Sequence, residues 1–366
     1  MLCLPWHFLW LGSTGQRGHR CPDDALELFK SMAREASVQD NFPEFHAGVP
    51  WWGGRLQTVA GALPTTRRRD VDQYPSTRLF ARVPDDTGDW LAATLHSPIR
   101  SDLTRCLVML IHGVSGSEDS SYILRSAVYF LNLGYPVLRV NLRGAGPSGP
   151  LCKGHYNAGT TDNLNQLVSM VPADLRSNGI VAMGYSLGAN LLMKFLGEQG
   201  SSSLIKASVA VSSPLDLAAV SRRLMQRDNA LFQFAILSQL KRESITPAVA
   251  LSKREREAVL SARTLWDFDE AFTAPQGGFS GAEDYYTRSS CIQFLEHITV
   301  PTLMIYASDD PIVPNDAYNQ YRWDKNPTLI LLLSKSGGHA GFREANCHAY
   351  WHDVCAARFL EKIAQI

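Results

Sequence analysis

Residues 180–196 read IVAMGYSLGANLLMKFL, and this stretch decides the fold of the chain. The apolar run 180–183 predicts a buried strand, and 187–196 predicts a helix that follows it at once. The intervening turn strains the backbone of its central residue, Ser186, and needs glycine-sized neighbours two positions before and after it. Gly184 and Gly188 supply them. The alternative is a tight strand-to-helix turn with an incidental serine; we expect instead that Ser186 projects above the sheet as a nucleophile.

Short apolar runs alternate with helical patterns on both sides of this turn. Besides 180–183, strands are expected at 79–83, 90–96, 106–111, 136–140, 207–211, 302–306 and 328–333, and helices at 121–133, 162–170 and 344–363. The first two strands flank Pro-Asp-Asp-Thr-Gly at 84–88, which predicts a hairpin. Buried strands that alternate with helices form a mostly parallel α/β sheet.

The pattern divides the chain into three parts. Residues 1–75 are expected to be an N-terminal tail and extended arm, because Gly, Pro, Arg and Trp occur there without sustained periodicity. Residues 76–214 and 300–366 form the core. Strands and helices no longer alternate over 215–299. Two charged segments with helical periodicity, 222–240 and 253–265, predict that this part is a lid insertion. The opening stretch 2–11 is either an export signal without a basic start or, within 1–31, a poorly structured tail.

Composition excludes several classes of protein. The 366 residues are 45% hydrophobic and 19% charged, as in an ordinary globular chain. The chain has 35 basic residues (Lys and Arg) and 35 acidic residues (Asp and Glu), so its formal net charge is zero. No overall positive charge is present to attract nucleic acid. The seven cysteines are scattered and never spaced as C-x-x-C, which argues against disulfides or zinc and favours a reducing, cytoplasmic location. No apolar run is long enough to span a bilayer, and oligomeric state is not readable from the sequence.

Two loops after later strands carry the groups that a serine nucleophile needs. A serine hydroxyl requires an imidazole to take its proton and a carboxylate to orient that imidazole. Asp309-Asp310 follows the strand at 302–306, and His339, between glycines, follows the strand at 328–333. The order serine, acid, histidine at strand carboxyl ends suits this architecture. Of the two acids we favour Asp310, because Asp309 abuts the strand and is better placed to cap the loop or the next helix.

The negative charge that develops in acyl transfer needs two backbone N–H groups. Leu187, directly after the serine, supplies the first. The second is expected from Val114, in the loop that follows the strand at 106–111. His112 in the same loop is expected to order it through hydrogen bonds and to take no part in the chemistry.

Together these residues resemble the α/β-hydrolase superfamily, and further text is similar to its YheT-like branch, which is related to eukaryotic lipid-cleaving hydrolases. The branch-like text comprises Gly54-Arg55-Leu56-Gln57-Thr58, Asn141-Leu142-Arg143-Gly144, Phe268-Asp269, Thr273-Ala274, Gly278-Phe279, Asp284-Tyr285-Tyr286, Asp309-Asp310-Pro311 and 337–342. Arg55, where a histidine is usual, and Ala340, where valine is more common, depart from it. The resemblance implies serine-dependent hydrolysis of carboxylic esters with short to medium acyl chains, or of simple lipids, without metal or organic cofactor.

Acyl transfer to another alcohol by the same residues remains open, as does a non-catalytic binding protein on this fold. The apolar segment 230–237 is expected to pack on the core, and a role in the wall of an acyl-chain site remains open. Trp51 and Trp52 are expected to pack, with at most transient contact with a membrane surface.

Three further patterns have simpler explanations than catalysis. Asp162, where the family keeps an acid, is explained by helix N-capping. Glu344, His348 and His352 recur every four residues but lack a fourth zinc ligand. His348 and Asp353 form an H-x-x-x-x-D pattern whose two side chains point apart on a helix, so we read it as coincidence.

Overall fold

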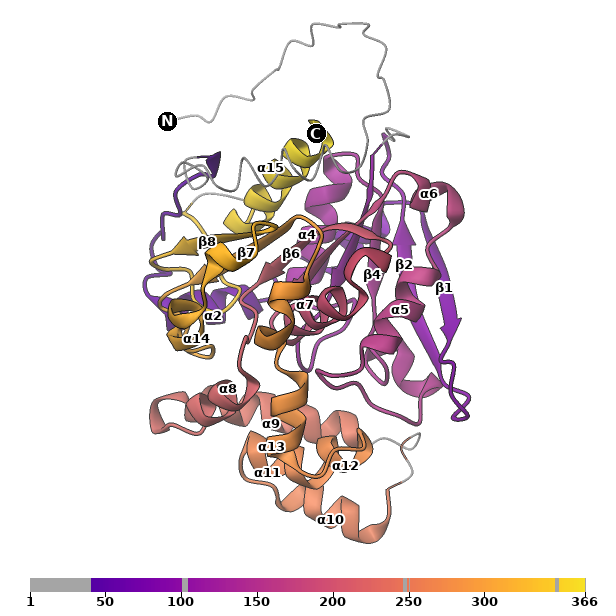
Figure 1. The fold of residues 1–366 in the computed structure, drawn as a ribbon, viewed down its shortest axis with the longest axis vertical. Helices are drawn as coiled ribbons and strands as arrows, with labels where there is room; N and C mark the ends of the chain where they lie inside the picture. The colour runs from indigo at the N-terminus through magenta and orange to yellow at the C-terminus, as the bar shows by residue number, and fades with distance from the viewer. Residues whose placement is uncertain (1–40, 101–104, 246–248, 250, 346–348, 366) are drawn as a thin grey trace, which may run out of the picture.

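The computed structural model describes residues 41–100, 105–245, 249, 251–345 and 349–365 (Figure 1). The proposed signal or tail at 1–31 lies outside them. The described strands form one eight-stranded sheet in the order β1-β2-β4-β3-β5-β6-β7-β8. The strands are β1 Ser76–Arg82, β2 Trp90–His96, β3 Leu107–Ile111, β4 Val137–Val140, β5 Ile180–Tyr185, β6 Ile205–Val211, β7 Thr302–Ala307 and β8 Leu329–Ser334.

The sheet is mostly parallel, as the sequence predicts. The hairpin β1–β2 is antiparallel, with Ser76 opposite His96, and β2 also runs antiparallel to β4. Every other neighbouring pair is parallel. The carboxyl ends of β3, β5, β6, β7 and β8 therefore meet at one edge, where the loops that follow them can approach one another.

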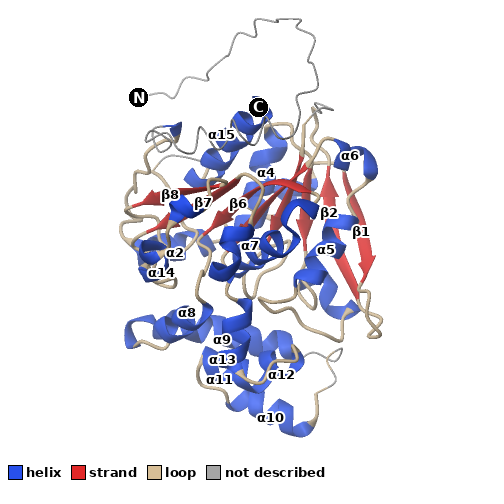
Figure 2. Ribbon diagram, in the orientation of Figure 1, coloured by secondary structure: helices blue, strands red, loops and turns tan. Residues whose placement is uncertain are grey.

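Helices cover both faces of the sheet (Figure 2). On one face lie α5 (Thr161–Ser169) and α7 (Leu187–Gln199), whose apolar side chains join one buried cluster. On the other lie α4 (Ser121–Asn132) and α15 (Trp351–Gln365), in a second cluster. Shorter elements are α6 Ala173–Ser177, α14 Asp316–Gln320 and the 3₁₀-helices Gly146–Leu151, Gly200–Ser202, Arg227–Asn229, Cys291–His297 and Trp323–Lys325.

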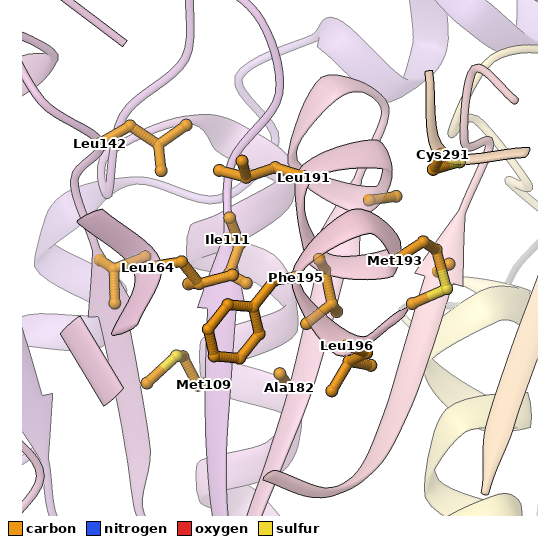
Figure 3. Close-up of a cluster of buried hydrophobic side chains, with 14 of the residues drawn as sticks. Met109, Ile111, Leu142, Leu164, Ala182, Leu191, Met193, Phe195, Leu196 and Cys291 are labelled. Carbon is orange, nitrogen blue, oxygen red and sulfur yellow. The ribbon is translucent and has the colours of Figure 1, made fainter. Parts of the chain in front are cut away.

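The helix that follows the serine turn is fixed by its packing on the sheet. Leu191 and Phe195 of α7 lie beside Ile111 and Met109 of β3 (Figure 3). These side chains are at most 1% exposed, so the hydrophobic effect holds the start of α7 against the sheet.

The segment between β6 and β7 forms a group of helices beyond one end of the sheet (Figure 1). It contains α8 Leu217–Leu224, α9 Ala230–Ser244, α10 Lys253–Ser261, α11 Leu265–Phe268, a π-helical turn Asp269–Thr273, α12 Ala274–Gln276 and α13 Ala282–Ser289. Two small apolar clusters lie largely within this segment. None of the described helices is both long and apolar enough to cross a membrane.

Two elements differ from the expectation. The arm is not extended throughout, because it contains α2 (Gly54–Ala62) and the short α3 (Arg68–Asp72). Helix α2 buries glycine, alanine, Gln57 and Thr58, so it lacks the apolar stripe that reveals a helix in a sequence. The last helix begins at Trp351 and not at 344, because Glu344 instead pairs in a β-bridge with Ala47.

Candidate active site

Ser186 occupies the strained turn between β5 and α7. Its φ of 51° and ψ of −122° lie where L-residues are rarely found, at a cost of about 1–3 kcal/mol. A Cβ at position 188 would lie 2.3 Å from the His112 carbonyl oxygen, and one at position 184 would lie 2.7 Å from the Gly188 oxygen. Both glycines are therefore required by close backbone approach, as the sequence predicts.

The structure brings Ser186, His339 and Asp310 together. His339 Nε2 lies 2.8 Å from Ser186 Oγ, and His339 Nδ1 lies 2.9 Å from Asp310 Oδ2. The other Asp310 oxygen, Oδ1, accepts hydrogen bonds from the backbone N–H groups of Ile312 and Val313 at 2.8 and 2.9 Å. A carboxylate fixed in this way favours the histidine tautomer with a proton on Nδ1, which leaves Nε2 free to accept from the serine hydroxyl.

Asp309 has a different contact from Asp310. Its Oδ1 accepts a hydrogen bond from the Gly338 N–H at 2.9 Å, so it links the acid loop to the histidine loop. Burial and the neighbouring Asp310 carboxylate raise the pKa of Asp309, while the Gly338 N–H opposes that shift. Only the second of the two adjacent acids contacts the imidazole.

The loop after β3 lies against the serine. A Cβ on Gly113 would be 3.1 Å from Ser186 Cβ, and both Val114 and Leu187 line the same cavity as Ser186. Among the described residues, the N–H groups of Val114 and Leu187 donate to no other group of the chain. They are thus free to donate to an oxygen held beside Ser186.

His112 is structural, as expected. Its Nδ1 lies 2.8 Å from the Gly113 carbonyl oxygen, and its Nε2 accepts a hydrogen bond from the Leu142 N–H at 3.1 Å. Burial lowers the pKa of His112 to about 4. The imidazole is therefore neutral at physiological pH, with both nitrogens already engaged.

The arm contributes residues to the site that the sequence did not identify. Thr58 Oγ1 of α2 accepts a hydrogen bond from the His339 N–H at 2.9 Å and donates to the Gly54 carbonyl at 2.7 Å. Gln57 accepts from the Arg343 N–H at 2.8 Å and donates to the Arg343 carbonyl at 3.0 Å. Both residues belong to the segment 54–58 that is similar to the YheT-like branch, and this similarity was the one feature of the sequence that pointed to them. Their distance from His339 along the chain does not indicate a contact.

The same helix also contacts the other loops around the site. A Cβ on Gly54 would overlap the Asp309 carbonyl, and one on Gly338 would lie 2.2 Å from the Gly54 carbonyl. Arg55 pairs with Asp228, just before α9, with Nη2 and Oδ2 2.6 Å apart. This replacement for the usual histidine therefore links the arm to the insertion.

A cavity of about 580 Å³ opens from Ser186 and His339 into the insertion. Its wall is mostly apolar and includes Leu217 and Val220 of α8 and Phe232 and Ile236 of α9. A cavity of this size lined by apolar side chains suits a hydrophobic substrate.

The remaining predicted residues lie away from the reacting groups. Asp162 is in the first turn of α5, whose N-cap residue is Thr160, so the N-cap expectation for Asp162 is wrong. His348 lies outside the described residues, and among those described no group of His, Cys, Asp and Glu can hold a metal ion. The Arg343 guanidinium lies over the Trp51 ring, 5.0 Å from the ring centroid. Trp52 is 63% exposed, so the expectation that it packs is wrong.

Comparison with known proteins agrees with this fold. A family model described as the alpha/beta hydrolase fold matches residues 107–345, more than half of the chain. The chain therefore belongs to the α/β-hydrolase fold family. An esterase of Pyrococcus furiosus has a similar structure, with a TM-score of 0.57 and 17% identity over 82% of this chain and 95% of that one; at this identity the likeness concerns the fold alone.

Curated relatives narrow the relationship to esterases and lipases. The putative esterase YheT of Escherichia coli is 29% identical over 293 residues, which cover 78% of this chain and 83% of that protein. The human phospholipase ABHD3 is 28% identical over 314 residues, covering 84% and 76%. The expected YheT-like resemblance is thus confirmed. The chain spans 66% of the length of an Abhydrolase domain-containing protein of Dictyostelium discoideum, which is 26% identical over 260 residues and 69% of this chain.

We predict that Thr58→Val slows covalent labelling of Ser186 by a fluorophosphonate probe about tenfold or more. Valine keeps the shape of threonine but leaves the His339 N–H without its acceptor, and an unsatisfied buried donor costs about 1–3 kcal/mol. Thr58→Ser restores the acceptor and should label within about threefold of the wild type. Equal rates for the valine and serine variants would contradict a positioning role for this hydroxyl.

Proposed function

We propose that this protein is a serine-dependent hydrolase of carboxylic esters with short to medium acyl chains, or of simple lipids. The observation that carries the proposal is the hydrogen-bonded chain from Ser186 through His339 to Asp310 at the end of an apolar cavity. The esterase, phospholipase and lipase names of its relatives support the same substrate class.

The proposed reaction proceeds through an acyl-enzyme. Ser186 Oγ attacks the ester carbonyl while His339 Nε2 takes the serine proton and then gives it to the leaving alcohol. Asp310 orients the imidazole and stabilises its charged form. The N–H groups of Leu187 and Val114 donate to the oxyanion. Water then attacks the acyl-enzyme with His339 as base, and no cofactor enters either step.

The insertion 215–299 serves in this proposal as a lid over the reacting groups. Its α8 and α9 supply apolar side chains to the wall of the cavity that contains Ser186. A lid of this kind excludes bulk water and sets the length of acyl chain that fits.

The first test uses Ser186→Ala and a ladder of p-nitrophenyl esters from acetate to palmitate. We expect the wild type to release p-nitrophenol and to be labelled by a fluorophosphonate, and the alanine variant to do neither. The best chain length reports the depth of the cavity. Analysis of products in the presence of an alcohol separates hydrolysis from acyl transfer. A folded wild type that neither labels nor turns over any ester would overturn the proposal.

The two adjacent acids provide a matched pair. Asp310→Asn should lower kcat roughly 10³- to 10⁴-fold, because the amide oxygen stays with the Ile312 and Val313 N–H groups and the NH₂ group then donates to Nδ1, which favours the wrong tautomer. Asp309→Asn should stay within about tenfold, because the asparagine oxygen can still accept from the Gly338 N–H. Rates of p-nitrophenyl butyrate hydrolysis measure both. The reverse order of effects would assign the acid role to Asp309.

We further propose transient contact with a lipid surface at the cavity opening. Leu231 of α9 and Val59 of α2 both line the cavity and are 84% and 44% exposed, so they lie at its opening. Phe234, one turn further along α9, is 71% exposed and does not line the cavity. Exposed apolar side chains around an opening suit contact with a lipid surface.

We predict that Phe234→Asp weakens co-sedimentation with phosphatidylcholine vesicles about tenfold. Burial of a phenylalanine side chain in an apolar phase is worth about 1.5–3 kcal/mol. Turnover of dissolved p-nitrophenyl butyrate should remain within about twofold. Leu260→Asp, at an exposed site on α10, is the control. Equal loss in both variants, or in neither, would argue against a specific contact at α9.

The location that best suits the chain is a reducing compartment, and we propose the cytoplasm. Four cysteines of the described residues, Cys106, Cys152, Cys291 and Cys355, are free thiols, and three of them are buried.

A further inference from the structure

The lid end of the cavity contains a buried carboxylate that the proposed reaction does not use. Asp269 begins the π-helical turn after α11, lines the cavity and is 6% exposed. Thr273 Oγ1 donates to its Oδ1 at 2.6 Å, and Tyr286 Oη donates to its Oδ2 at 2.6 Å. Two hydroxyl donors aimed at one carboxyl group favour its ionised form.

This carboxylate has no protein countercharge in the described part of the chain. Burial raises the pKa of Asp269 to about 6, which the two hydroxyl groups oppose, and no positive side chain contributes. The two hydroxyl hydrogen bonds favour the ionised form against this effect of burial. A buried charge with no partner of opposite sign is costly, which is why such charges in proteins are usually paired.

Aromatic side chains share the cavity wall with the carboxylate. Tyr285 and Tyr286 of α13 and Phe268 of α11 line the cavity with it. The Trp266 ring, outside the cavity, packs edge-on against Tyr286 with 5.0 Å between centroids and already has the Arg222 guanidinium over it, 5.4 Å from its centroid. The faces of aromatic rings attract cations, and quaternary ammonium groups bind in sites built from such rings. An anion among tyrosines, inside an apolar cavity, matches a weakly hydrated cation better than any neutral group.

We propose that this end of the cavity binds an ammonium group carried by the ester substrate, with Asp269 as its counterion and Tyr285 and Tyr286 beside it. The inference rests on the proposed hydrolysis at Ser186 and specifies its substrate class as cationic esters. The alternative is that Asp269 only holds the insertion together through its hydrogen bond with Tyr286. That role does not require a charge, because the neutral amide of an asparagine can also accept from the tyrosine hydroxyl.

The test compares esters that differ only in charge. Choline butyrate and 3,3-dimethylbutyl butyrate have the same shape with and without a positive charge on the alcohol. The p-nitrophenyl esters of 6-(trimethylammonio)hexanoate and 7,7-dimethyloctanoate make the same comparison on the acyl side. We expect kcat/KM of the wild type to favour the cationic member of at least one pair tenfold or more. The favoured pair identifies the side of the ester that lies towards Asp269.

Asp269→Asn keeps the shape of the side chain and removes its charge. The ratio of kcat/KM for the cationic member to kcat/KM for the neutral member should fall to about onefold in this variant. Asp267→Asn is the matched control, because Asp267 is an exposed acid of the adjoining helix α11, where its carboxylate accepts from the N–H of the N-cap residue Thr264, and it does not line the cavity. It should retain the wild-type preference.

The outcomes separate this proposal from the proposed hydrolysis. A wild type that hydrolyses the neutral esters equally well or better in both pairs overturns the ammonium site and leaves the hydrolase intact. This comparison needs no variant, so it holds even if Asp269→Asn fails to fold. A preference that survives in a folded Asp269→Asn also overturns the proposal. Absence of turnover of every ester would instead count against the hydrolase itself.

Discussion

The strained backbone of Ser186 is the constraint on which the rest of the site depends. A positive φ at a serine costs free energy, and it persists only if the surrounding structure holds it. The holding elements are β5, which is buried along its whole length, and α7, which packs on the sheet through residues such as Phe195. Gly184 and Gly188 permit the close approach, and the loop at His112 closes over the turn. The position of the Ser186 hydroxyl at the wall of the cavity is thus a consequence of core packing.

The second requirement is that loops far apart in the sequence converge on this hydroxyl. The parallel order of β5 to β8 brings the loops after β7 and β8 to the same edge of the sheet as Ser186. Sheet topology alone does not fix the position of an imidazole within a few tenths of an ångström. Helix α2 supplies that precision by contacting the backbone of both loops, with Thr58 bound to the His339 N–H and Gly54 packed on Asp309. The arm is accordingly part of the site.

The features that could be predicted from the sequence are those determined by residues close together in the chain. The strand runs, the serine turn and the order of the three catalytic candidates each depend on residues close together in the chain, so the fold and the positions of Ser186, Asp310 and His339 could be read directly. Helix α2 could not, because its buried face consists of glycine, alanine and two polar side chains. The residues of the histidine loop to which it is hydrogen-bonded are more than 250 positions away. The start of the last helix was misplaced for a similar reason, since the bridge between Ala47 and Glu344 competes with helix formation.

Helix α9 shows how one apolar segment can meet three different demands. An apolar helix without a polar face is expected to be buried all round, and the residues 230–237 suggested packing on the core or an acyl-chain wall. In the structure Leu237 is buried in an apolar cluster of the insertion, with Leu240, Val259 and Phe268. Phe232 and Ile236 line the cavity, and Phe234 faces solvent. Leu240 and Phe268 of that cluster also line the cavity, so the packing of the insertion and the shape of the cavity wall depend on the same side chains. Phe234, on the solvent-facing side, is 71% exposed, and this exposure is the observation behind the proposed contact with a lipid surface.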